Sequence, residues 1–195
     1  MKKASLYLLA ILLSSLLLTS CGGSSSTTDV ETSDSSTPRT INYKTSDFTI
    51  DVPDTWETVN DFVGDYPENL RIAFKNNIKD TTFTANVTVL RENNPDGLTS
   101  ADYAQTKLAI HKNHLLNYTL ISQEQNTLTV SGADSAAIMS TFSGKNTATS
   151  PTLEFMQVVL CKADRAWIVT ASYRPDEDEF TIEKMQDMLN SFAVR

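Results

Sequence analysis

The chain has 195 residues, 40% of them hydrophobic, and a formal net charge of −8. It is long enough for one folded domain of ordinary size. Its acidity excludes binding to nucleic acid through the phosphate backbone, and anionic lipid headgroups would repel it. Only two cysteines are present, Cys21 and Cys161, so a disulfide framework is not expected once the first has another role.

The first segment has the parts of a bacterial export signal. Lys2 and Lys3 give it a positive start, and residues 6–18 are an apolar run broken only by two serines. This run is shorter than the roughly 20 apolar residues that a spanning helix needs. Leu-Thr-Ser-Cys at 18–21 resembles the lipobox of bacterial lipoproteins. The resemblance implies cleavage after residue 20, a diacylglyceryl group on the Cys21 thiol and an acyl chain, such as palmitate, on the new amino group.

A plain secretory signal that contains a cysteine is the alternative interpretation of this segment. Removing residues 1–20, which carry two lysines and no acidic residue, takes the net charge from −8 to −10. A chain this acidic would need its lipid to stay at a membrane, because electrostatic attraction would not hold it there.

Residues 22–40 predict a disordered tether between the lipid and the folded domain. They are rich in Ser, Thr and Gly, and Val30 is their only aliphatic residue before the predicted domain. Such a segment cannot bury enough apolar surface to offset its ordering entropy. As a flexible linker it would span roughly 25 Å on average. A peptide ligand is the alternative role. Gly22, in place of Asp, resembles the sorting signal for an outer-membrane destination.

Residues 41–195 predict one globular domain that contains strands, a helix, further strands and a final helix. Apolar and polar residues alternate in several stretches, as in half-buried strands, and Pro53 ends the first of them. A turn is expected at 94–97, a polar turn at 124–126, another turn at 131–134, and a small, polar, mobile loop at 143–151. The alternation predicts strands at 48–52, 71–75, 83–90, 118–123, 127–130 and 136–142.

Residues 153–162 and 166–173 predict a hairpin closed by residues 163–165. Both segments are apolar on both faces at their centres, around Cys161 and Trp167. A strand buried on both faces belongs in the middle of a sheet. We therefore expect this hairpin near the centre of the domain.

Two amphipathic helices are expected to pack on the sheet. The first begins at Thr99 or Ser100, and the second covers residues 178–192, with the acidic residues 176–179 at its positive N-terminus. Together with the strands they predict an α+β fold with an antiparallel sheet layered by helices. The apolar stripes are Ala101, Ala104, Leu108, His111 and Leu115 in the first helix, and Ile182, Met185, Leu189 and Phe192 in the second.

The segment from Phe48 to Trp56, with Ile50, Val52 and Pro53 between them, resembles the opening motif of the PsbP-like superfamily. The middle helix, the hairpin and the final helix are similar to later landmarks of that family. This resemblance covers residues 41–195 and implies an α/β/α sandwich around an antiparallel sheet. Members include extrinsic photosystem II subunits, a nuclear-import protein that binds a small GTPase, and bacterial envelope lipoproteins. They act mostly as binding and assembly factors.

Few residues are candidates for chemistry. His111 and His114 stand at i and i+3 on the first helix and could contribute to a metal site, but one buried and one exposed histidine is the expectation. Cys161 is expected to be a buried, unreactive thiol. The acidic residues 176–179 lack the spacing of a calcium loop, so a solvated helix start is expected.

These observations predict a non-catalytic lipoprotein that acts as a protein-binding or assembly module. We expect it to be lipid-anchored through Cys21 on the extracytoplasmic side of a membrane in the bacterial envelope. Its partners would be that membrane and an envelope protein, with no nucleic acid, no cofactor, no metal and no catalytic residue. One alternative is a lipoprotein that binds a small ligand, a lipid or a metal, for which a deep apolar pocket between sheet and helix would be the sign. The other is an enzyme, which would need a nucleophile and a base within hydrogen-bonding reach.

Overall fold

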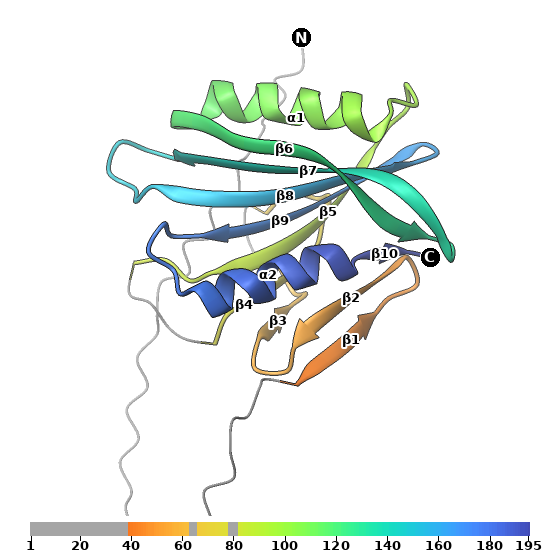
Figure 1. Cartoon of the computed structure of the whole chain (residues 1–195), viewed down its shortest axis with the longest axis horizontal. Helices are drawn as coiled ribbons and strands as arrows, with labels where there is room; N and C mark the ends of the chain where they lie inside the picture. Colours follow the sequence, from red (N-terminus) through yellow and green to blue (C-terminus); the bar gives the residue numbers. More distant parts are fainter. Residues whose placement is uncertain (1–38, 63–65, 78–81) are drawn as a thin grey trace, which may run out of the picture.

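The computed structural model describes residues 39–62, 66–77 and 82–195 (Figure 1). The expected signal peptide, Cys21 and the tether up to residue 38 lie outside these residues. No helix within them is long and apolar enough to cross a membrane. The elements are β1 (Thr40–Lys44), β2 (Phe48–Pro53), β3 (Glu57–Val59), β4 (Leu70–Lys75), β5 (Asn86–Asn93), α1 (Ser100–His114), β6 (Leu116–Val130), β7 (Ala133–Lys145), β8 (Leu153–Lys162), β9 (Arg165–Tyr173), α2 (Glu179–Ser191) and β10 (Ala193–Val194).

The described strands form one curled sheet in the order β1-β2-β10-β6-β7-β8-β9-β5-β4-β3 (Figure 1). Neighbouring strands are antiparallel except for β10 and β6, which are parallel. The expectation of a fully antiparallel sheet is therefore wrong, and the sheet is mixed. The reason is that the chain re-enters the sheet after α2 as a strand of two residues, too short to produce an alternating pattern.

Within the described residues, α1 and α2 pack on opposite faces of the sheet. α1 contacts mainly β7 and β8, and α2 contacts mainly β2 and β9. Side chains of β8 alternate between the two layers: Val158 and Leu160 belong to the core under α2, and Val159 to the core under α1. One helix on each face agrees with the expected layering. The molecule is nevertheless mostly β, and two helices cover less of the sheet than a helix-covered sandwich implies.

The predicted central hairpin is confirmed. β8 and β9 pair along their whole length and lie between β7 and β5. Their connection is a tight turn of two residues, Ala163 and Asp164, and Ala163 has a φ of 51°. The apolar residues on both faces of this hairpin thus contact both helix layers.

Residues 116–130 are a single strand, not two short strands around a polar turn. β6 pairs with β7 from Leu116 to Val130, through the residues 124–126 that were expected to turn. The partner strand is longer than expected as well, because residues 143–145 belong to β7 and not to a mobile loop. Pairing with β7 holds these polar residues in an extended conformation. They can be polar because their side chains are not buried in the core.

β5 begins later than the alternation predicts. The strand covers Asn86–Asn93, so Phe83 and Ala85 precede it. Val87 and Val89 remain in the core under α2, as expected. Phe83 instead packs with Leu108 of α1 in a separate cluster on the opposite side of the sheet. The Phe83 ring therefore packs under α1 and not in the core under α2.

Both helices begin with the expected caps. Thr99 accepts a hydrogen bond from the backbone N–H of Asp102 at 3.1 Å, and Asp178 accepts one from Thr181 at 2.9 Å. Hydrogen bonds from Thr181, first from its side chain and then from its backbone N–H, lower the pKa of the Asp178 carboxyl. The acidic run before α2 is thus a helix start, as predicted.

Candidate functional site

β6 has a strand neighbour on only one side over most of its length. β7 pairs with all of it, whereas β10 pairs only with Thr129 and Val130. The end of α2 reaches the same side at Asn126, whose Nδ2 donates to Oδ1 of Asn190 at 3.2 Å. Within the described part of the chain, no strand pairs with residues 116–125 on their outer side. We call these residues the open edge.

Most of the open edge is uncovered on both faces, although Tyr118 packs on Phe142. Residues 119–125 are all exposed, although successive side chains of a strand point to opposite faces of the sheet. Three large aliphatic side chains of β6 are among the exposed ones: Leu116 is 47% exposed, Leu120 45% and Ile121 54%. Exposed apolar residues gathered on one element are a sign of an interaction surface.

Features that normally protect a sheet edge are sparse here. Natural proteins place lysines, prolines or covering loops along such edges, because unpaired N–H and C=O groups can pair with another chain. β6 contains no lysine and no proline, and Glu124 is its only charged residue. Its register shifts between Leu116 and Thr119 and between Leu120 and Ser122. Bulges of this kind twist an edge, but they leave the stretch after Ser122 regular.

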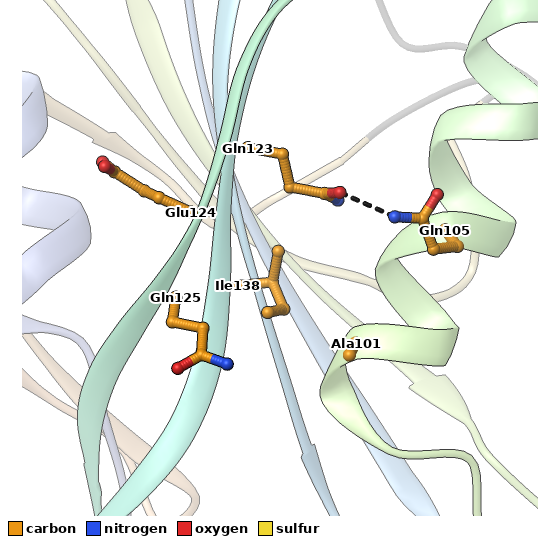
Figure 2. Close-up of a pocket in the computed structure, with 6 residues that line it drawn as sticks. All are labelled: Ala101, Gln105, Gln123, Glu124, Gln125 and Ile138. Atoms are coloured by element: carbon orange, nitrogen blue, oxygen red, sulfur yellow. Dashed lines mark hydrogen bonds between the residues drawn. The ribbon is translucent and has the colours of Figure 1, made fainter.

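A hollow of about 180 Å³ lies beside the open edge, between α1 and β6 (Figure 2). Figure 2 shows Gln123 pointing toward α1, where its Oε1 accepts a hydrogen bond from Nε2 of Gln105 at 2.6 Å. A drug-sized ligand needs roughly 300 Å³ or more, so this hollow suits a protruding side chain better than a small molecule. Its lining residues are Ala101, Gln105, Gln123, Glu124, Gln125 and Ile138.

The position of α1 beside this hollow is set by a buried polar cluster on the other side of the helix. Glu92 of β5 accepts hydrogen bonds from Nζ of Lys107 at 2.8 and 3.0 Å and from the hydroxyl of Tyr103 at 2.5 Å. Burial, together with the bond to Glu92, raises the pKa of Tyr103. Tyr103 and Lys107 are therefore buried, while Ala101, expected in the apolar stripe, is exposed at the hollow.

The two histidines of α1 face different surroundings, as predicted. His111 is buried, its ring stacked on Phe142 at 4.7 Å and its Nε2 3.4 Å from Oε1 of Gln157. Burial, and secondarily the charge of Lys107, lowers its pKa to about 4. His114 is exposed, with Nδ1 2.8 Å from the carbonyl oxygen of Ile110. No group of three or more His, Cys, Asp or Glu that could hold a metal occurs within the described residues.

Cys161 is half-buried, less enclosed than predicted. Its backbone N–H donates to Oγ of Ser100 at 3.0 Å, and this hydroxyl donates to the carbonyl oxygen of Ala136 at 2.8 Å. Burial raises the pKa of the thiol to about 11. The direction of this change is the one that the apolar neighbours predicted, and it disfavours the reactive thiolate.

Sequence patterns missed the open edge for a definite reason. A half-buried strand alternates between apolar and polar residues, but residues 122–127 are all polar because neither face is covered. One signal could have indicated a strand here. The apolar pair Leu120 and Ile121 precedes the polar run and lies close enough in sequence to the next strand to form a hairpin with it.

No family model and no curated protein matches this chain. Several solved structures are similar to it. The cyanobacterial PsbP protein CyanoP from Synechocystis sp. PCC 6803 has a TM-score of 0.59 at 15% identity, covering 91% of this chain and 99% of its own. This chain has the PsbP-like fold. The expectation from the motif at residues 48–56 is thereby confirmed at the level of the fold.

Two further structures with this fold come from proteins of other kinds. The Ran-binding protein Mog1p of Saccharomyces cerevisiae has a TM-score of 0.57 at 8% identity, covering 80% of this chain and 95% of its own. LpqN, a Mycobacterium tuberculosis protein involved in cell envelope biogenesis, has a TM-score of 0.52 at 13% identity, covering 80% and 89%. Identities this low relate the folds and not the functions.

Proposed function

We propose that this PsbP-like protein is a non-catalytic lipoprotein of the bacterial cell envelope that binds another protein. The observation that carries the proposal is the open edge, where the outer side of β6 has no strand partner among the described residues and three aliphatic side chains are exposed. Similar folds in a Ran-binding protein and in a protein of cell envelope biogenesis support an interaction module. Strand edges and exposed apolar patches are surfaces that other proteins recognise.

The anchoring part of the proposal rests on the sequence. Leu-Thr-Ser-Cys at 18–21 follows a charged start and a short apolar run, the arrangement of a lipoprotein signal. Lipid chains on Cys21 would hold the protein at the extracytoplasmic side of a membrane, because each buried CH₂ contributes about 0.8 kcal/mol. Gly22 favours the outer membrane. The residues between Cys21 and β1 would let the domain reach a partner roughly 25 Å away.

The non-catalytic part rests on how the reactive groups are used. A nucleophilic cysteine needs a lowered pKa and a neighbouring base, whereas burial raises the pKa of Cys161 to about 11. The imidazole of His111 is stacked on Phe142 and has a pKa of about 4. Both groups support packing, and neither is placed for acid–base work near neutral pH.

Fractionation and cross-linking of intact cells test the proposal. Wild-type protein, labelled metabolically with a fatty acid, should be found in the membrane fraction, carry the label and give a discrete product with a protein cross-linker. Cys21→Ala, expressed at the same level, should lose the label and keep residues 1–20, because both lipidation and cleavage of the signal need the Cys21 thiol. An unlabelled, soluble wild-type protein would contradict the anchor, and the lack of any cross-linked product would contradict protein binding.

A further inference from the structure

We propose that the open edge binds its partner by strand addition, in which an extended segment of another envelope protein pairs with residues 116–125 of β6. This inference rests on the proposed function and names the binding site. Main-chain hydrogen bonds to the open edge would position the segment. Its alternate side chains would contact the apolar residues of β6 and the hollow beside α1, which would give specificity.

The turn between β6 and β7 determines which backbone groups face outward. Ser131 and Gly132 form a connection of two residues with φ of 51° and 82°, the values of the mirror-image turns that close tight hairpins. Val130 and Ala133 flank it and begin a register that continues without a shift back to Ser122. In an antiparallel pair, alternate residues exchange hydrogen bonds with the partner and the others point away from it.

One hydrogen bond identifies the residues that point away from β7. The N–H of Ser131 donates to the carbonyl oxygen of Val194 at 2.7 Å, on the β10 side. Counting back in steps of two along the regular register, Gln123 and Gln125 direct their N–H and C=O groups to that same side. Beyond β10 these groups face the open edge, so they offer two donors and two acceptors at the spacing of a sheet ladder.

Side chains along the edge give an added strand two different contacts. Leu120 and Ile121 provide exposed apolar surface at one end. Gln123 and Gln125 flank the hollow at the other end, and Ile138 also lines it (Figure 2). Because side chains two residues apart lie on the same face of a strand, one side chain of the partner would lie over Leu120 or Ile121, and another on the face of Gln123 would enter the hollow.

The charge of the chain favours a different protein over a second copy of this chain as the occupant of the open edge. Glu124 is the only charged residue of β6, and Figure 2 shows its side chain pointing away from the hollow. The whole chain carries −8, so two copies would bring like charges together, whereas a basic segment would be attracted. The occupant is therefore an extended segment with alternating apolar residues and a Lys or Arg opposite Glu124.

Two variants at one position isolate the backbone contribution. Gln125→Pro and Gln125→Ala both remove the side chain, but only proline removes the outward N–H. Proline at such an outward position of an edge strand leaves the ladder to β7 intact. The probe is a library of random 12-residue peptides, selected against the full mature protein in detergent micelles. Thermal unfolding of each variant checks that its fold is kept.

The selected peptides should alternate apolar and polar residues and contain Lys or Arg. They should bind Gln125→Ala nearly as tightly as wild type and Gln125→Pro about tenfold more weakly, which is the effect of losing one well-placed hydrogen bond. Residue-resolved hydrogen exchange should show that a bound peptide slows exchange at Gln123 and Gln125. The amide of Glu124, which points to β7, should be slow with or without peptide.

Equal affinity for Gln125→Pro and wild type would overturn strand addition. Without peptide, the protein could instead form a dimer in which protection of the Gln125 amide rises with protein concentration and which Gln125→Pro makes monomeric. This result would show that a second copy binds the open edge, and it would overturn the proposed partner. Should Gln125→Pro not fold, Ile121→Gln and Phe180→Gln replace it. Only Ile121→Gln should weaken peptide binding, about tenfold, because Phe180 is also exposed but lies on α2. Equal effects of the two variants would overturn the site.

The fate of the cross-linked product in cells separates this inference from the proposed function. If Gln125→Pro retains that product at the wild-type yield, protein binding stands and its site lies elsewhere. Loss of the product in Gln125→Pro, with retention in Gln125→Ala, supports both.

Discussion

The imidazole of His111 lies between α1 and the sheet, against Phe142 and Gln157. Its pKa is about 4 in the folded protein and 6.5 in a model compound. The unfolded chain therefore takes up a proton first as the pH falls. The stability that comes from the neutral ring is fully present above pH 6.5 and is lost progressively as the pH falls toward 4.

Replacing His111 by Gln should remove this pH dependence. Between pH 7 and pH 4, wild-type protein should lose about 3 kcal/mol more of its unfolding free energy than His111→Gln, the energy that the lowered pKa represents. Urea unfolding at a series of pH values measures the difference. His114→Gln is the matched control, because that ring is exposed. A variant at 111 that keeps the wild-type dependence would show that the ring is not the titrating group.

Cys161 should react slowly in the folded protein. A pKa of about 11, where the model value is 9.0, lowers the thiolate fraction at pH 8 about 100-fold, and the thiolate is the reactive form. In a Cys21→Ser background, where it is the only thiol, we expect a chromogenic disulfide reagent to label it about 100-fold faster after denaturation in urea. Similar rates in the two states would mean that burial does not control this thiol.

At the scale of elements, the contact between α1 and β5 fixes one wall of the hollow. The Lys107 and Glu92 side chains are only 10% and 19% exposed. If one charge were removed, water could therefore not fully solvate the other. Lys107→Met should cost about 3 kcal/mol in unfolding free energy, because it leaves a buried carboxylate without its cation. Lys184→Met is the control: its partner Asp187 is 68% exposed, and exposed pairs contribute at most about 1 kcal/mol.

A double variant tests whether the cost comes from the uncompensated charge. Glu92→Gln combined with Lys107→Met should be more stable than Lys107→Met alone, since it removes the carboxylate as well. If the two changes simply add, the pair does not interact as the geometry indicates.

Elements with strong local signals could be predicted from the sequence. The β8–β9 hairpin is apolar on both faces, and its central place follows from that alone. α2 has a cap at Asp178 and an apolar stripe that includes Met185 and Leu189. Such signals need only neighbouring residues, because they report burial and capping directly.

Elements whose environment is set by distant residues could not be predicted. β10 has two residues and exists because α2 ends between β2 and β6. The middle of β6 is polar because nothing covers it, so its pattern was that of a turn. Lys107 is buried because Glu92 of β5, fifteen residues earlier, pairs with it between α1 and the sheet. The open edge is itself the lack of a neighbour, which a local pattern does not report.

At the scale of the whole molecule, the sheet formed by the ten described strands leaves one long strand available for another chain. α1 and α2 cover opposite faces, and α2 ends where β6 meets β10 (Figure 1). The outer side of β6 beyond that point is away from both the short β10 and the β1–β2 hairpin. A domain with this layout, tethered through Cys21 as proposed, could pair with an envelope protein without changing its own fold.

Site-specific photo-cross-linking in living cells tests the central claim most directly. A photoreactive amino acid replaces Ile121 on the open edge or, in a matched control, Phe180 on α2; the two side chains are 54% and 46% exposed. We expect a discrete cross-linked protein product from position 121 and none from position 180. A product of equal yield at both positions, or at position 180 alone, would contradict the account.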